Sequence, residues 1–228
     1  SSRSGVMTYF ISISLAIFFS CAAATYDKFH KEKKIELNTL NFFSTSKKLW
    51  YFLMPIFIVI SVVGNFIRIK VELDYMAFLR WLVLIFVVLY ISIIDCKERI
   101  IPNKLILFLL GIRIFILIYE VIQSIDLWRM VIWIPILGML IGGLTILLGM
   151  FISRKGVGGG DIKLYAIIGL YVGSYYILGT LFYSFLYSAI YGLYLLIFKK
   201  AKVRDSIPMA PFALLGVVTS FGFLCIGG

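Results

Sequence analysis

The fold of this chain is decided by the stretch Gly156-Val157-Gly158-Gly159-Gly160-Asp161-Ile162-Lys163, which separates two strongly apolar segments. Consecutive glycines remove side-chain bulk, so the backbone can turn sharply there and another chain can approach it closely. A carboxylate at the edge of membrane-length sequence is costly to maintain, which makes Asp161 a candidate functional residue. Taken alone, Asp161 is also explained as a cap on a helix that begins at Ile162. A second carboxylate, brought to it from another helix, would instead make a catalytic pair.

Composition sets the class of protein. Of the 228 residues 62% are hydrophobic, and the mean hydropathy is +1.03, which is more apolar surface than a soluble domain can bury. The long apolar runs predict an all-α, polytopic membrane protein. The formal charge of +11 does not indicate a nucleic-acid partner, because the basic residues occupy short loops, where they set membrane orientation and meet lipid headgroups. Cys21, Cys96 and Cys225 lack the paired spacing of a disulfide framework or a zinc site, and His30 is expected to be solvated.

Eight apolar segments, most of them near the roughly 20 residues that a spanning helix needs, predict about eight transmembrane helices. The sixth is short, so we expect a broken helix that is buried among the others and whose start lines a cavity. We place its end at Gly173-Ser174, because the seventh segment would otherwise be far too long. The segments are residues 6–26, 49–67, 76–94, 104–122, 131–152, 162–172, 174–198 and 207–226.

The domain organisation follows from the same segments. Residues 1–5 lack a methionine and are expected to be an expression-vector remnant, with Met7 as the natural start. Residues 6–228 are then expected to form a single integral membrane domain, with a basic cytoplasmic loop at 27–48.

Positively charged side chains predict how these segments are oriented. Sixteen of the 22 lysines and arginines lie in or beside the loops after the first, third, fifth and seventh segments. Positive charge favours the cytoplasmic side, so these loops should face inward and both termini outward. Asp161 then lies at the cytoplasmic edge of the membrane.

Small and polar residues within the segments indicate helix packing. Gly138 and Gly142 form a G-x-x-x-G pair, which lets two backbones approach in lipid. Arg113 falls in the middle of the fourth segment and needs a partner, for which Glu120, two turns on along the same face, is the nearest candidate in sequence. A face of small residues and a stripe of tyrosines on the seventh segment are also expected to be packing surfaces; they are Thr180, Ser184, Ser188 and Gly192, and Tyr183, Tyr187 and Tyr191.

Three other carboxylates share the inner edge with Asp161, namely Asp95, Glu98 and Asp205. Asp95 directly ends the third segment at membrane depth, whereas Glu98 is expected in an open, charged turn, so the best pair is Asp95 with Asp161. Two close carboxylates cannot both ionise cheaply, so one stays protonated and can act as an acid while the other can act as a general base. The two titrate as a coupled pair, and the sequence assigns neither role to a particular residue.

Three ordered stretches resemble the motifs of type IV prepilin peptidases, a family of intramembrane aspartic proteases. Asp95, followed after five residues by Ile101-Pro102-Asn103, resembles the first catalytic motif, and Gly158-Gly159-Gly160-Asp161-Ile162-Lys163 resembles the G-x-G-D signature. Ile207-Pro208-Met209-Ala210-Pro211-Phe212 is similar to a third family segment, with Ala210 where glycine is expected. The resemblance covers roughly residues 76–226.

The resemblance implies an aspartic endopeptidase that removes the basic leader peptide from type IV prepilins or pseudopilins at the cytoplasmic face of the bacterial cytoplasmic membrane. It implies no cofactor and no metal for the proteolysis. Larger members carry a cysteine-bearing, zinc-binding inner domain, whereas residues 27–48 contain no cysteine, so an N-methyltransferase activity, which would use S-adenosylmethionine, is in doubt. The implied catalytic residues are Asp95 and Asp161, and the implied substrate-binding or supporting residues are Pro102, Asn103, Gly158, Gly159, Gly160, Lys163, Pro208 and Pro211.

Other functions fit the sequence less well. A proton- or cation-coupled transporter could use two membrane-edge acids, but it would not need both motifs. A membrane scaffold would explain the small-residue faces and leave both acids without a purpose. Presenilin-like proteases share G-x-G-D, yet the segments around Asp95 and near the C-terminus fit prepilin peptidases better. Cys96 is not favoured as a nucleophile, because the single histidine lies in another loop and no triad order is visible. Glu98 and Asp205 would attract the basic leader or be ordinary solvated charges.

Overall fold

The computed structural model of the chain describes residues 74–153, 158–198 and 207–227, together with residues 55, 56, 58–60, 62–64 and 66. The chain divides into two compact units, residues 1–75 and residues 76–228. In the first unit, the described residues between 55 and 66 are helical, as predicted for the segment 49–67. The predicted segment 6–26 and the loop 27–48 lie outside the described residues, and the single membrane domain stays a prediction.

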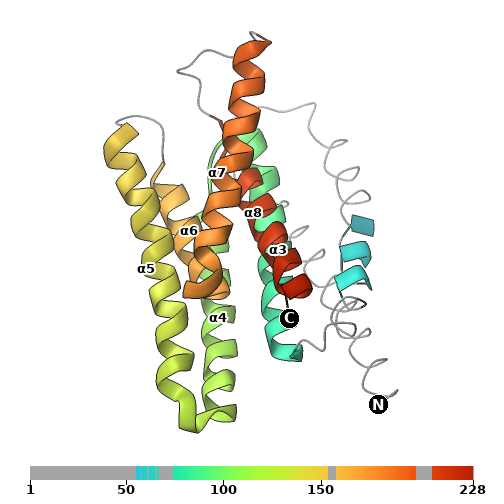
Figure 1. The fold of residues 1–228 in the computed structure, drawn as a ribbon, viewed down its shortest axis with the longest axis vertical. Coiled ribbons are helices and arrows are strands. Elements are labelled where there is room, and N and C mark those ends of the chain that lie inside the picture. Colours follow the sequence, from blue (N-terminus) through green and yellow to red (C-terminus); the bar gives the residue numbers. More distant parts are fainter. Residues whose placement is uncertain are drawn as a thin grey trace, which may run out of the picture. The chain divides into compact units, whose positions relative to one another are not determined.

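The second unit is built from helices, and no strand occurs in the described residues. The all-α class is therefore confirmed. Four helical stretches are long and apolar enough to cross a membrane: 75–98, 103–123, 125–152 and 174–197. The elements are α3 (Tyr75–Glu98), α4 (Asn103–Gln123), the 3-10 helix η1 (Ile125–Leu127), α5 (Trp128–Ser153), α6 (Gly159–Val172), α7 (Ser174–Ile197) and α8 (Ala210–Gly227) (Figure 1).

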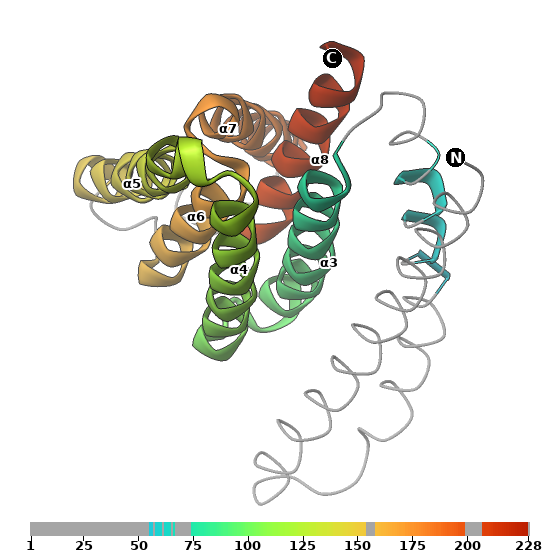
Figure 2. The same ribbon diagram turned by 90° about the horizontal axis from the view of Figure 1, so that it is seen from below.

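The short helix α6 is the centre of this unit, where it contacts α4, α5, α7 and α8 (Figure 2). It packs on α5 through backbone atoms, because a Cβ added at Gly138 would overlap the Gly169 carbonyl oxygen, and a Cβ at Gly142 would overlap that of Tyr165. The packing role predicted for Gly138 and Gly142 is thus confirmed. The predicted break after α6 is also present, since Gly173 has a φ of +82°, a conformation that favours glycine.

Two residues of the predicted packing face of α7, Thr180 and Ser184, lie against α8. Thr180 Oγ1 donates to Ser220 Oγ at 2.9 Å, and a Cβ at Gly216 would overlap Ser184 Oγ. The three tyrosines of the stripe also contact α8. Tyr183 stacks on Phe223 with 5.4 Å between ring centroids, the Tyr187 hydroxyl lies 3.0 Å from Thr219 Oγ1, and the Tyr191 ring lies 5.5 Å from that of Phe212. The stripe is therefore a packing surface, as predicted.

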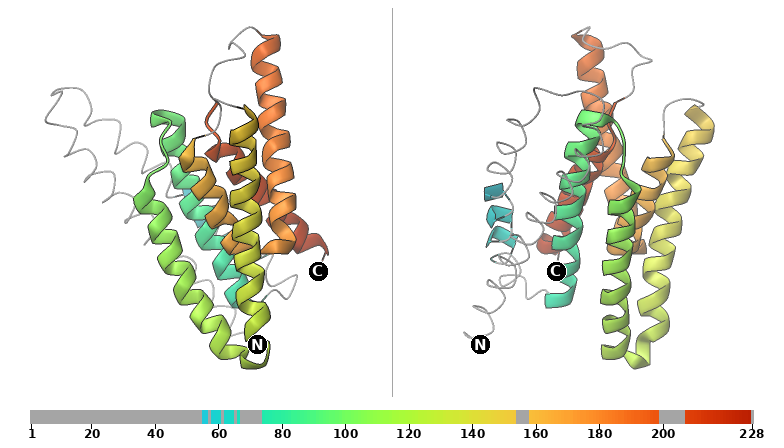
Figure 3. Two further views of the ribbon diagram at one scale, coloured as in Figure 1. Left: turned by 90° about the vertical axis from the view of Figure 1, so that its left-hand side faces the viewer. Right: turned by 180° about the vertical axis from the view of Figure 1, so that it is seen from behind.

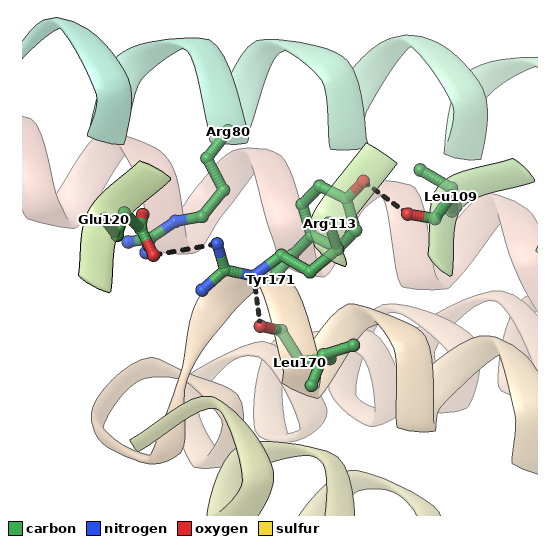
Figure 4. Close-up of polar contacts among 6 residues, drawn as sticks. All are labelled: Arg80, Leu109, Arg113, Glu120, Leu170 and Tyr171. Carbon is green, nitrogen blue, oxygen red and sulfur yellow. Dashed lines mark hydrogen bonds and ion pairs between the residues drawn. The ribbon is translucent and has the colours of Figure 1, made fainter. Parts of the chain in front are cut away.

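A partly buried charged network joins α3, α4 and α6 (Figure 4). Arg113, whose side chain is fully buried, donates from Nη1 to Glu120 Oε2 at 2.9 Å, which confirms the predicted partner. Its Nε donates to the Leu170 carbonyl oxygen at 3.0 Å, so that Arg113 caps the C-terminal end of α6. Arg80 of α3, which sequence analysis did not place in this network, donates to Glu120 Oε1 at 3.0 Å.

Two predicted helix boundaries are wrong. α3 continues to Glu98 rather than ending at 94, so Glu98 is helical although it is exposed, and the chain turns at Arg99 with a φ of +53°. α6 begins at Gly159 rather than at Ile162. Asp161 is consequently the third residue of α6 and not its cap residue, and it stabilises the helix start by reaching back to the Gly158 N–H.

Candidate active site

Several helix ends meet at one end of the second unit, the upper end in Figure 1. The turn between α3 and α4 lies there with the starts of α6 and α8, as two further views also show (Figure 3). The three stretches singled out in the sequence supply these ends, so segments that are far apart along the chain come together. The positive ends of the α4, α6 and α8 dipoles converge on this region.

Asp95 lies in the last turn of α3 with only 5% of its surface exposed. Its Oδ2 accepts a hydrogen bond from the backbone N–H of Ala210, the first residue of α8, at 3.0 Å. The bond is buried and joins residues 115 positions apart in the sequence. Because a buried carboxylate without a partner is costly, α8 supplies a donor that Asp95 needs.

Asp161 lies in the first turn of α6, outside the four membrane-length stretches, and is partly buried. Its Oδ2 accepts the Gly158 N–H at 3.0 Å. Burial raises the pKa of Asp161 above its ordinary value, the hydrogen bond from Gly158 lowers it, and the negative charge of Asp95 raises it again. The end of α3, which carries Asp95, and the start of α6, which carries Asp161, lie at the same end of the unit (Figure 1).

Contacts between the first two motifs fix this arrangement. A Cβ added at Gly160 would lie only 3.1 Å from the Cβ of Ile101, so the absence of a side chain lets α6 approach the turn that follows Asp95. Lys163 Nζ donates to Asn103 Oδ1 at 3.0 Å, between exposed side chains of α6 and α4. Pro102 precedes α4 as its cap residue, with φ of −69° and ψ of 119°.

Four other predicted site residues make no such contact between the first two motifs; they are Gly158, Gly159, Pro208 and Pro211. A Cβ at Gly159 would meet nothing within 4 Å, and one at Gly158 would meet the Asp161 carboxylate and the Gly160 nitrogen. Among Gly158, Gly159 and Gly160, the expected close approach of another segment therefore occurs at Gly160 alone, and a side chain at Gly159 would enter open space. Pro208 is half-buried two residues before α8, and Pro211 is the second residue of that helix.

Sequence reasoning missed the hydrogen bond from the Ala210 N–H to Asp95, because it noted Ala210 only as a departure from an expected glycine. A backbone donor leaves no signature of its own, but Pro211 was a usable signal, because proline favours the first turn of a helix. Of the other inner-edge acids, Glu98 is exposed at the end of α3, and Asp205 lies outside the described residues. Within the described residues, no group of three or more histidine, cysteine or carboxylate side chains is placed to hold a metal ion.

Comparisons with known proteins agree with the arrangement of the motifs. Residues 82–193 match the type IV leader peptidase family. The chain is 30% identical over 139 residues to the prepilin leader peptidase/N-methyltransferase of Bacillus subtilis (strain 168), an alignment that covers 61% of this chain and 53% of that protein. The chain therefore spans about half the length of this relative. No solved structure matches the chain. These matches, together with the three motifs at one end of the helical unit, make residues 82–193 similar to the type IV leader peptidase family.

Proposed function

We propose that this protein is an intramembrane aspartic endopeptidase that removes the basic leader peptide from type IV prepilins or pseudopilins. The observation that carries the proposal is that the end of α3, which carries Asp95, and the start of α6, which carries Asp161, lie at the same end of the unit (Figure 1). Two carboxylates that share a site hold one proton between them near neutral pH. Such a pair supplies both the base that activates water and the acid that polarises the scissile carbonyl.

The surroundings of the pair support a peptide substrate. A Cβ at Gly159, in the first turn of α6, would meet nothing within 4 Å, so this turn offers room for an extended substrate backbone to approach. A prepilin presents a basic leader, a cleavage site and then an apolar helix, and that helix would lie in the bilayer beside the apolar helices of the enzyme. The excess of positive charge in the loops on this side supports a site at the cytoplasmic face of the cytoplasmic membrane.

The proteolysis proposed here uses water and the two carboxylates, and it needs no cofactor. S-adenosylmethionine would be used only if a methyltransferase activity accompanied it. We further propose that methylation is weak or absent, since residues 27–48, which the sequence predicts to be a loop, contain no cysteine and are too few to bury a core of their own.

The test is co-expression with a prepilin in a bacterium that lacks its own leader peptidase, followed by N-terminal sequencing of the pilin. Asp95→Asn and Asp161→Asn should each reduce leader removal by at least about 100-fold, because neither amide can exchange the proton that the reaction moves. Glu98→Gln, which alters an exposed carboxylate three residues from Asp95, is the matched control and should retain most activity. Substantial cleavage by either aspartate variant, in protein shown to be inserted in the membrane, would overturn the proposal.

A further inference from the structure

The turn between α6 and α7 lies well inside the outer ends of α4 and α5, on the side of the unit opposite the candidate active site (Figure 1). A Cβ added at Gly138 would lie 2.7 Å from the carbonyl carbon of Gly173, and one at Gly173 would lie 2.9 Å from Cγ2 of Ile134. The turn is therefore level with residues 134–138 of α5. The exposed charge of Arg129, at the tip of the α4–η1–α5 hairpin, is about 10 Å further out, because a helix rises roughly 1.5 Å per residue.

The part of the hairpin beyond the turn has a surface that suits lipid. Its large exposed side chains are apolar and include Ile118, Ile122, Met130 and Trp133. Such a surface is favoured in hydrocarbon and at its boundary, so the turn lies at membrane depth. The length of α6 agrees, because its 14 residues span about 21 Å, whereas the hydrocarbon core is about 30 Å thick.

The start of α7 presents backbone donors that the protein does not pair. Its cap residue, Gly173, has no side-chain acceptor, and the Gly173 carbonyl oxygen accepts the N–H of Ile177 at 3.2 Å. Within the described residues, the N–H groups of residues 174–176 have no hydrogen-bond partner. Tyr175 is 77% exposed and Ser174 is half-buried, so the surrounding medium reaches this turn. Unpaired backbone groups are too costly to face hydrocarbon, and non-helical backbone at membrane depth needs protein or water around it.

Two buried side chains at the same turn also have unpaired donors. Trp81 of α3 is 1% exposed and its ring lies 6.2 Å from that of Tyr176, but its Nε1 has no hydrogen-bond partner. The guanidinium of Arg113, which bonds to Leu170 at this end of α6, is fully buried and its Nη2 is likewise unpaired (Figure 4). Buried polar groups without a protein partner generally bond to ordered water. Water can also donate to the last carbonyl groups of α6.

We propose that water enters the membrane from the outer side as far as the α6–α7 turn, where it pairs with the N–H groups at the start of α7 and with the buried donors of Trp81 and Arg113. The turn is then an outward-facing aqueous site, about 10 Å beneath the charged tip of the hairpin. The helix that carries Asp161 at its inner end thus has polar surroundings at both ends, although it is too short to span the hydrocarbon core. This inference does not depend on the proposed function.

The experiment measures how fast a membrane-impermeant, negatively charged methanethiosulfonate reacts with a thiol at the turn in intact cells. Ser174→Cys should react at least about tenfold faster than Leu137→Cys, because the reactive thiolate forms in water and not in hydrocarbon. Leu137 is the matched control, since it is level with the turn but lies on the apolar surface of α5, where it is 44% exposed. Tyr175→Cys gives the same reading if the Ser174→Cys protein does not accumulate. The full chain carries serine at its own three cysteine positions, Cys21, Cys96 and Cys225.

Three outcomes would overturn the proposal. If neither Ser174→Cys nor Tyr175→Cys reacts, in protein shown to be inserted, the turn lies in lipid. If Leu137→Cys reacts as fast as Ser174→Cys, the hairpin stands outside the membrane and the turn is not at membrane depth. If Ser174→Cys reacts only in inside-out vesicles, the turn opens to the cytoplasm.

Discussion

Arg113 in α4 donates a hydrogen bond to the carbonyl oxygen of Leu170, near the C-terminal end of α6, at 3.0 Å. At the opposite end of α6, Lys163 bonds to Asn103 at the start of the same helix α4. The helix that carries Asp161 is therefore tied to α4 at both ends, and its position relative to Asp95 depends on these ties. Figure 4 shows the interior tie, in which Glu120 and Arg80 complete the network.

Arg113→Met should destabilise the fold by about 3–5 kcal/mol, because it uncaps α6 and removes one of the two arginines that neutralise the buried part of Glu120. The measurement is thermal unfolding of the purified protein in detergent. Arg129→Met is the matched control, since Arg129 is exposed and its contact with the Trp128 ring is worth only about 1 kcal/mol or less. Equal stability of the two variants would show that the network contributes nothing to the fold.

Arg80 and Asp161 mark the limit of what could be predicted from the sequence. The segments, the break at Gly173 and the partnership of Arg113 with Glu120 follow from hydropathy, charge cost and helical spacing, which are local properties. Arg80 lies in the apolar third segment, and the cost of its charge was the available signal that it also needed a partner. The true start of α6 was not predictable in the same way, because glycines disfavour a helix locally and the Asp161 side chain overrides that preference. The bond from Ala210 to Asp95 depends on the tertiary fold.

Asp161→Asn should stabilise the fold at pH 8. The pKa of Asp161 is raised above its ordinary value of 3.8, so the folded chain retains a proton at pH values where the unfolded chain has lost it. Above the folded pKa the native state carries a desolvated charge, which the asparagine removes; below about pH 3.8 both residues are neutral and the gain disappears. Thermal unfolding of both proteins at pH 8 and at acidic pH checks this sign, and a gain that is independent of pH would contradict it.

Gly160→Ala should reduce cleavage, because the new Cβ would lie 3.1 Å from that of Ile101 and would push α6 away from the turn after Asp95. Ile101→Ala in the same chain makes room for this methyl group and should restore part of the activity. The measurement is the initial rate of leader removal by the single and double variants. An Ile101→Ala change that worsens the Gly160→Ala defect would exclude steric displacement as its cause.

Gly138→Ala should destabilise the protein by about 1–3 kcal/mol, because the added Cβ would overlap backbone atoms of Gly169 and Gly173. Gly149→Ala in the same helix is the matched control, since its Cβ would meet nothing within 4 Å and alanine is the better helix former by roughly 0.5–1 kcal/mol. Thermal unfolding in detergent should thus give shifts of opposite sign. Loss of stability in both variants would point to a general intolerance of α5 to substitution.

The name of the Bacillus subtilis relative combines a leader peptidase with an N-methyltransferase, and the two activities can be measured separately in this protein. We expect the purified protein to remove the leader in the presence of S-adenosylmethionine and to leave the new N-terminus largely unmethylated. Mass spectrometry of the processed pilin measures this directly, and processing by a peptidase known to methylate provides the reference mass. A quantitative gain of one methyl group would place a transferase site within this chain.

The contact between Gly138 and Gly169 joins α5 to α6 through main-chain atoms, so it contains no side chains that could be exchanged for one another. In an ordinary protein interior, evolution can enlarge one residue and shrink the residue that faces it. Here both partners are already the smallest residue, and a gain in size on either side has no complementary loss on the other. A larger residue at Gly138 or Gly169 therefore cannot be compensated by a smaller residue on the facing helix. It would require α5 and α6 to pack in a different way.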